Sequence, residues 1–218
     1  MLARETVDFL KKLDKNNNRD WFNANKDAFL RANDNVIAIT GELISRISRF
    51  DPLVASIDPK SCVFRIYRDV RFSKDKSPYK TNLGAFIAPG GKKTMAPGYY
   101  FHVQPRMFFS AAGKHLPDAS ELLKIRNAIV SNTKEFLKIV NDKKFKQRFG
   151  DLDAERLSKP PKGFPADHAA IEYLKLKSFT VSEEFSAKDA VSKDYPKMLA
   201  DSFRAAYPLV EFLRKALK

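Results

Sequence analysis

The 218-residue chain has few of the residues that stabilise small secreted proteins or anchor a protein in a membrane. Its single cysteine, Cys62, cannot form a disulfide within the chain, and we expect it to pack as a small hydrophobic side chain. No apolar run approaches the roughly 20 residues that span a bilayer, and the N-terminus lacks the basic and apolar segments of a secretory signal. The sequence therefore predicts a cytoplasmic protein with no membrane partner.

Metal-binding and nucleophile motifs are also missing. The chain has three scattered histidines and contains no Cys-x-x-Cys, His-Glu-x-x-His or Gly-x-Ser-x-Gly pattern. We therefore expect no metal site, and the sequence identifies no cofactor.

Acidic residues are fewer than basic ones. The chain has 40 lysines and arginines against 26 aspartates and glutamates, a net charge of +14. Hydrophobic residues make up 44% of the chain, which excludes a disordered protein, and the length is that of one large domain. We expect a single domain over residues 1–218 and a partner that carries negative charge.

Hydrophobic periodicity predicts helices towards both ends of the chain. Apolar residues recur at helical spacing from residue 2 to 13 and from 18 to 50, where the second helix should break near Asn33–Asn35. Helical spacing returns over residues 117–140, with Pro117 in the first turn, and over 142–150, 167–174 and 194–217.

Short β-prone runs separated by glycine and proline occupy the middle of the chain. They cover residues 63–68, 83–88, 99–104 and 106–111, and a further run covers 178–182. Helices followed by strands and then helices favour an α+β fold over a parallel α/β fold. We expect an antiparallel sheet of about four to six strands in the middle of the chain, packed by N-terminal and C-terminal helices.

Basic residues are concentrated beside the first of these runs. Between Lys60 and Lys93 there are nine basic residues against only Asp69 and Asp75, an excess equal to half the net charge of the chain. Aromatic residues are interleaved with them, a pattern typical of sites that bind phosphorylated ligands. The predicted anion-binding residues are Arg65, Arg68, Arg71, Lys76 and Lys80.

Strand alternation predicts where this site would lie. If residues 63–68 form a strand, Arg65 and Tyr67 share one face, and Tyr100 and His102 share one face of the strand 99–104. Antiparallel pairing would place all four on a half-exposed sheet face beneath the loop 71–80. The predicted aromatic and polar lining consists of Tyr67, Tyr79, Tyr100 and Asn82.

Four residues are candidates for proton transfer. His102 would act as a general acid or base if Asp69 or Asp167 oriented it, although a hydrogen-bonded structural histidine is the simpler interpretation. Asp167 and His168 precede a predicted helix, where Asp167 could cap the first turn or, with His168, help to form an anion site. The predicted catalytic residues are therefore His102, Asp69, Asp167 and His168.

Several motifs together resemble an uncharacterised family, domain of unknown function 2461. They are Phe64–Ser73, Lys76–Asn82, Gly98–Tyr100 with His102, and Pro161–Phe164 with Asp167 and His168. The resemblance covers nearly the whole chain. It implies a single α+β domain and assigns neither an activity nor a catalytic residue.

Three functions remain open at this point. The first is an enzyme acting on a phosphorylated small molecule or nucleotide, and the second is a non-catalytic module that binds nucleic acid. The third is a structural or interaction protein without a ligand, in which the basic motif only joins a strand to a loop.

Overall fold

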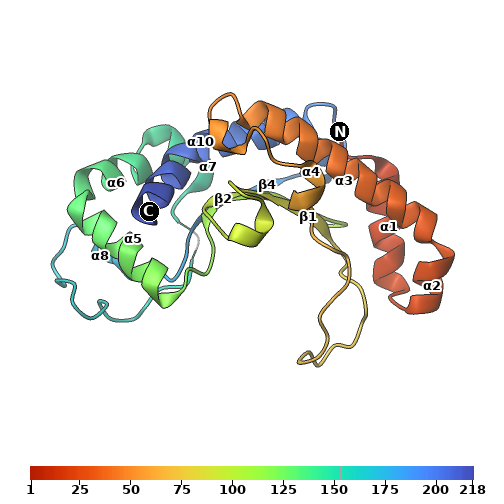
Figure 1. The fold of residues 1–218 in the computed structure, drawn as a ribbon, viewed down its shortest axis with the longest axis horizontal. Coiled ribbons are helices and arrows are strands. Elements are labelled where there is room, and N and C mark those ends of the chain that lie inside the picture. The colour runs from red at the N-terminus through yellow and green to blue at the C-terminus, as the bar shows by residue number, and fades with distance from the viewer. Residues whose placement is uncertain (153) are drawn as a thin grey trace.

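An antiparallel sheet of four strands lies in the middle of the chain (Figure 1). The computed structural model describes residues 1–152 and 154–218. The strands follow one another in the order of the sequence: β1 (Leu83–Ile87), β2 (Gly98–Gln104), β3 (Met107–Lys114) and β4 (Phe179–Phe185). The predicted α+β class with a central antiparallel sheet is confirmed.

Helices flank the sheet in sequence on both sides. Before it come α1 (Arg4–Lys15), α2 (Arg19–Ala24), α3 (Lys26–Ile47), the 3-10 turn η1 (Pro52–Val54) and α4 (Pro59–Cys62). The turn η2 (Lys92–Thr94) lies between β1 and β2, and the later helices are α5 (Ala119–Ser131), α6 (Thr133–Val140), α7 (Lys143–Phe149), α8 (Ile171–Leu174), α9 (Ala187–Ala190) and α10 (Tyr195–Ala216). In the described part of the chain, no helix is both long enough and apolar enough to cross a membrane.

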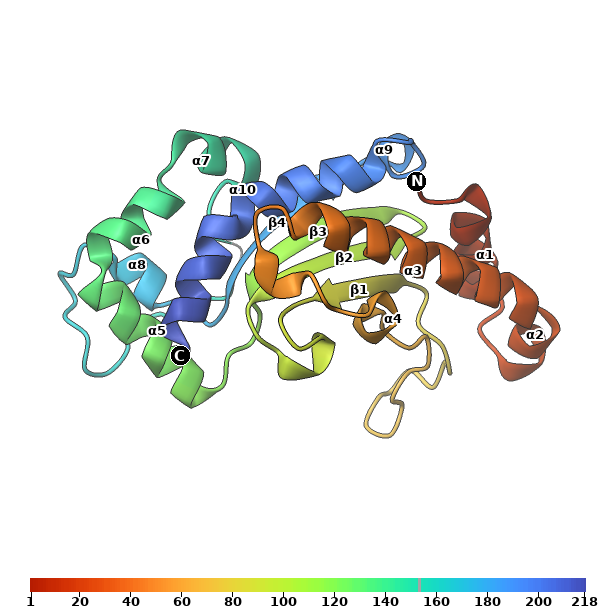
Figure 2. The same ribbon diagram turned by 45° about the horizontal axis from the view of Figure 1, so that its top comes forward.

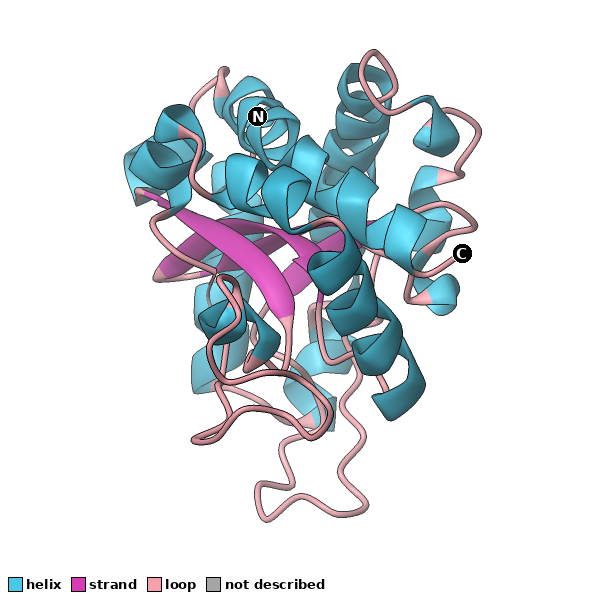
Figure 3. Cartoon of the chain, turned by 90° about the vertical axis from the view of Figure 1, so that its left-hand side faces the viewer, coloured by secondary structure: helices cyan, strands magenta, loops and turns pink. Residues whose placement is uncertain are grey.

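The two long helices α3 and α10 lie across the same face of the sheet (Figure 2). Alternation along β2 sends Tyr99, Phe101 and Val103 into the core beneath them, and all three are fully buried. Tyr100 and His102 point to the other face and are half-buried. Figure 3 shows helices above the strands and the longest loops below them. The predicted division of this strand into an apolar and a polar face is confirmed.

A buried ion pair joins the C-terminal helix to this core. Asp51, 1% exposed, accepts hydrogen bonds through the same Oδ2 atom from the Tyr99 hydroxyl (2.8 Å) and from the Arg214 guanidinium (2.7 Å). Arg214 also donates through Nε to the carbonyl of Pro97 at 2.8 Å. These bonds connect η1, β2 and α10.

The predicted strand over residues 63–68 is wrong. Only isolated bridges form there, between Val63 and Ala85 and between Tyr67 and Tyr79. Beyond Phe64, whose amide donates to the Gly84 carbonyl (3.0 Å), the segment leaves the edge of β1 and pairs with residues 78–80 instead. Pro78 has no amide hydrogen and therefore cannot extend that pairing into a ladder.

The predicted helix break near Asn33–Asn35 is also wrong, because the chain breaks at Asn25, between α2 and α3. The side chain of Asn25 donates to the Trp21 carbonyl at 2.8 Å. Asn35 stays helical because its side-chain oxygen accepts bonds from the backbone of Ala3 (2.9 Å) and the hydroxyl of Thr6 (3.0 Å). The Asn35 side chain therefore bonds α1 and the residue before it, and does not compete for the backbone of its own helix.

Candidate functional site

The basic motif forms an irregular two-stranded ribbon with a loop at its end. The backbone amide of Lys80 donates a hydrogen bond to the carbonyl of Ile66 (2.7 Å), and the backbone amide of Arg68 donates one to the carbonyl of Pro78 (3.0 Å). Residues 69–77, called the basic loop from here on, project from the body of the molecule below β1 (Figure 1). The ribbon is held to the N-terminal helices by Asn17, whose side chain bonds both the amide (3.1 Å) and the carbonyl (2.9 Å) of Tyr79.

Arg68 is already paired within the loop. Its guanidinium donates to the carboxylate of Asp75 and to the hydroxyl of Ser73 at 3.3 Å. Hydrogen bonds from Ser77, and then the contact with Arg68, hold the pKa of Asp75 well below its usual range. Arg68 therefore closes the base of the basic loop through a neighbouring acid.

Arg71 and Lys76 also have acceptors of their own. Arg71 makes a two-point contact with Asp69, at 3.0 and 2.6 Å, which lowers the pKa of that carboxyl group. Lys76 donates through Nζ to the carbonyl of Val70 at 3.0 Å. Three of the five predicted anion ligands thus help to shape the loop, and they do not converge on a common cavity.

Arg65 and Lys80 differ from the other three. In the described part of the chain, neither side chain has an ion pair or a hydrogen bond to an acid. The Lys80 ammonium is half-buried and lies 5.7 Å from the centre of the Phe64 ring. Burial, and then the nearby charge of Arg65, lower the pKa of Lys80. Two neighbouring cations therefore lie at the edge of the sheet without a hydrogen-bonded acid, although the charge of Arg65 contributes to the lowered pKa of Asp69, which is itself bonded to Arg71.

A hydrogen-bonded row of polar side chains on β2 adjoins these cations. The hydroxyl of Tyr100 lies 2.8 Å from Nδ1 of His102, whose Nε2 lies 3.1 Å from the side-chain oxygen of Gln104. Because an amide oxygen only accepts, His102 donates from Nε2 and accepts the Tyr100 hydroxyl at Nδ1. Tyr100 also contacts the edge of Phe64, with ring centres 6.1 Å apart, which places the row next to Lys80.

Burial controls the protonation of this row. It lowers the pKa of His102 and raises the pKa of Tyr100 to about 12. The His102 ring is stacked on Phe109 at 4.7 Å, and both ring nitrogens are occupied. Among the residues that the structure describes, Asp69 and Asp167 make no hydrogen bond or ion pair to His102. The arrangement favours a neutral histidine that holds Tyr100 in place.

Gly84 on β1 was not identified from the sequence as part of this site. A Cβ atom there would lie 2.9 Å from the Tyr100 hydroxyl and 2.6 Å from the carbonyl oxygen of Phe101. Real Cβ atoms do not approach other atoms so closely, so glycine is what allows Tyr100 to lie over β1. Asn82 lies half-buried directly before this strand.

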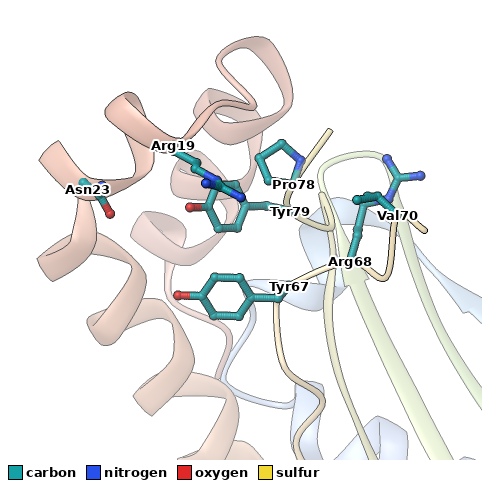
Figure 4. Close-up of a pocket in the computed structure, with 7 residues that line it drawn as sticks. All are labelled: Arg19, Asn23, Tyr67, Arg68, Val70, Pro78 and Tyr79. Atoms are coloured by element: carbon teal, nitrogen blue, oxygen red, sulfur yellow. The ribbon is translucent and has the colours of Figure 1, made fainter. Parts of the chain in front are cut away.

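A pocket of about 340 Å³ opens on the other side of the ribbon (Figure 4). Tyr67 and Tyr79 form its floor with ring centres 5.4 Å apart, and Tyr79 is stacked on Phe22 at 3.9 Å. Arg19 and Asn23 come from α2, whereas the side chain of Arg68 extends away from the tyrosine hydroxyls (Figure 4). Tyr67 thus packs towards α2, and the expected sheet face shared by Arg65, Tyr67, Tyr100 and His102 does not form.

The segment containing Asp167 and His168 lies beside α8 at one end of the molecule, well away from the basic loop below β1 (Figure 1). Asp167 is exposed, and α8 begins after Ala170 without a side-chain cap, so the predicted capping role of Asp167 is wrong. His168 accepts the amide of Ala170 at 3.1 Å and lies 3.3 Å from the hydroxyl of Thr133. The fold does not bring these two residues to the basic motif.

Comparison with known protein families agrees with the resemblance seen in the sequence. A family model described as a conserved hypothetical protein, DUF2461, matches residues 5–212. The chain belongs to this family. Searches of curated proteins and of solved structures found no significant match.

In this DUF2461 protein, the motifs that carried the resemblance lie in two separate regions. Phe64–Ser73, Lys76–Asn82 and Gly98–Tyr100 meet at the ribbon and β2, whereas Pro161–Phe164 lies at the far end beside α8 (Figure 1). No group of three or more histidine, cysteine or acidic side chains in the described ranges is arranged to hold a metal ion. The strongest candidate site of the DUF2461 chain is therefore the one around Arg65, Lys80 and Tyr100.

Proposed function

We propose that the protein binds a phosphorylated ligand through Arg65 and Lys80, beside Tyr100. The observation that carries this proposal is the half-buried ammonium of Lys80, which has Arg65 as its charged neighbour and no acid as partner. Bringing two cations together and removing one of them from water costs free energy. A bound phosphate would offset that cost by neutralising both charges.

The two cations would have different parts in binding. Arginine presents a planar pair of donors that matches two phosphate oxygens, and lysine supplies a compact charge. The Tyr100 hydroxyl, held by His102, would define one wall of the site. Arg68, Arg71 and Lys76 would act indirectly, by keeping the basic loop in shape.

Binding is proposed here without a proton-transfer step. His102 has both ring nitrogens hydrogen-bonded, Asp69 is paired with Arg71, and Asp167 and His168 lie at the far end of the fold. The cytoplasmic location also stays a prediction. One domain over residues 1–218 remains our interpretation, and the continuous hydrophobic cluster from Leu2 to Leu213 supports it.

Isothermal titration calorimetry with inorganic pyrophosphate and with a nucleoside monophosphate tests the proposal. Lys80→Gln should abolish or strongly weaken binding, whereas Lys124→Gln, the same change at an exposed lysine on α5, should leave it unchanged. A ligand at about 100 times its Kd should also stabilise the native protein by about 2.7 kcal/mol in thermal unfolding. Equal binding by the two variants would contradict the proposal.

The pH dependence gives a second test. Affinity should rise as the phosphate loses its second proton, near pH 6, because the ligand gains charge. It should fall again in alkaline solution as Lys80 loses its proton, and the lowered pKa of Lys80 places that fall below the pH expected for a free lysine. A flat profile above neutral pH would show that Lys80 does not hold the anion.

A further inference from the structure

The exposed aromatic side chains of this protein are confined to one short segment. The chain has 18 phenylalanines, seven tyrosines and one tryptophan. Of these, only Phe64 (37%), Tyr67 (51%) and Phe72 (96%) are exposed, and all are in the described part of the chain. Burial of an aromatic ring is favourable, so rings left in water within nine consecutive residues call for a partner that covers them.

Each exposed ring lies beside positive charge. Lys80 lies 5.7 Å from the centre of the Phe64 ring, and Arg71 lies 5.9 Å from that of Phe72. Tyr67 shares its pocket with Arg19, whose side chain has no acidic partner among the described residues. Each of the three rings in residues 64–72 therefore has a cation beside it, and of these cations Arg71 is already paired with Asp69 whereas Lys80 and Arg19 make no ion pair in the described part of the chain.

The basic loop presents its ring in a defined position. Arg68 and Asp75 close the loop, and Lys76 ties its Nζ to the carbonyl of Val70 across it. Phe72 projects from this frame with 96% of its surface in water and touches only Arg71 among the ring and cation contacts. A partner that stacks on Phe72 therefore loses less binding free energy to ordering of the loop than it would on a flexible segment.

We infer that the phosphorylated ligand is a single-stranded nucleic acid, which passes from one side of the ribbon to the other so that its bases stack on Phe64, Tyr67 and Phe72 while its phosphates lie near the neighbouring cations. This inference rests on the proposed function, because Arg65 and Lys80 would hold one phosphate of the strand. Single strands expose the faces of their bases, whereas a duplex keeps them stacked inside. RNA and DNA share this chemistry, so both belong in the test.

A membrane surface fits the same residues less well. The three rings are not equally accessible, because Phe72 is 96% exposed on the basic loop whereas Phe64 and Tyr67 are 37% and 51% exposed. Tyr67 also lies in the pocket against Phe22 and Tyr79, behind the loop end that would meet a bilayer first.

Fluorescence anisotropy with labelled oligo(dT) and oligo(U) of roughly 12 nucleotides tests the inference, since such lengths match typical single-strand sites. Phe72→Leu should weaken binding by roughly 5-fold to 100-fold, because leucine has no ring on which a base can stack. Phe72→Trp keeps an aromatic ring and should retain binding. Leu53→Ala, which changes an apolar side chain that is 62% exposed on η1, is the control and should have no effect. A duplex of the same length should bind more weakly than either single strand.

Pyrophosphate titration of the same variants separates the inference from the proposed function. Phe72→Leu with normal pyrophosphate binding and weakened oligonucleotide binding supports both. Unchanged oligonucleotide binding by Phe72→Leu, or equal binding of the duplex, overturns the inference and leaves the phosphate site standing. Vesicles of phosphatidylserine and phosphatidylcholine that bind through Phe72, with no binding of either oligonucleotide, also overturn it. If the wild-type protein does not bind pyrophosphate, the proposed function and the inference are both overturned.

Discussion

Replacing Arg214 with methionine should destabilise the protein more than any exposed charge change, because it leaves a carboxylate buried without its cation. Asp51 is 1% exposed, and the side chain of Arg214 is 9% exposed. In Arg214→Met, the Asp51 carboxylate keeps only the Tyr99 hydroxyl as donor, and its Oδ1 atom has no partner even in the wild type. Pro97 also loses the bond to its carbonyl.

The magnitude follows from the depth of this pair. Removing one partner of a buried ion pair costs roughly 3–5 kcal/mol, because the remaining charge stays desolvated. For a chain of this length, 1 kcal/mol shifts Tm by about 2–4 °C, so Tm should fall by about 6–20 °C. Removing both partners, in Asp51→Leu with Arg214→Met, should recover much of the loss.

Urea unfolding followed by circular dichroism measures these differences, with Lys215→Met as the control. Lys215 is the next residue on α10, its side chain is 60% exposed, and its contact with Glu211 at 3.5 Å lies in water. Its loss should change the free energy of unfolding by less than about 0.5 kcal/mol. A cost for Arg214→Met within 1 kcal/mol, as a rough limit, of that control would refute the reasoning. So would a double variant no more stable than Arg214→Met alone.

Three further predictions concern the candidate site. Lys80→Met should raise the free energy of unfolding at neutral pH, because burial and Arg65 disfavour the charged ammonium. That gain should shrink as pH rises through the lowered pKa of Lys80, and urea midpoints that match wild type at neutral pH would contradict it. Between pH 10 and about pH 12 the wild type should lose stability, since the Tyr100 phenol ionises first in the unfolded chain, and Tyr100→Phe should flatten this fall by at most about 2 kcal/mol. An unaltered slope in a pH series of urea unfolding would count against it. Gly84→Ala should cost about 1–3 kcal/mol and weaken pyrophosphate binding by displacing Tyr100, whereas Gly41→Ala within α3 should not destabilise; equal thermal stability of the two variants would exclude the steric argument.

Much of the fold could be predicted from local patterns. Asn18 caps α2 by accepting the amide of Trp21 at 2.9 Å, and Asp142 caps α7 in the same way. Alternation located the buried and half-buried faces of β2. These features depend on residues within a few positions of one another, so the sequence contains what is needed to find them.

The errors arose where distant residues compete for the same groups. Residues 63–68 have the composition of a strand, yet their partner is the short segment ending at Pro78–Lys80. Asn35 was predicted to break the helix, but its side-chain oxygen accepts hydrogen bonds from Ala3 and Thr6. Neither outcome can be read from a window of neighbouring residues, because each depends on which element packs beside it.

The candidate site divides in the same way. The density of basic residues around Arg65–Lys80 was visible in the sequence, and the two acids that neutralise Arg68 and Arg71 lie within seven residues of them. The role of Gly84 and the pocket formed with Arg19 were not visible, since the contacts reach across separate elements.

The sequence by itself determined the α+β class, the faces of β2 and the position of the cationic segment along the chain, because period, capping and charge are local properties. Only the tertiary structure decided which cations are free to meet a ligand. Lys80 has no acidic partner because the acids of the basic loop are held by Arg68 and Arg71. Its ammonium is half-buried because it packs against Phe64, beside Arg65. Burial and neutralisation are properties of the folded surroundings of a side chain, and they differ for identical residues only a few positions apart.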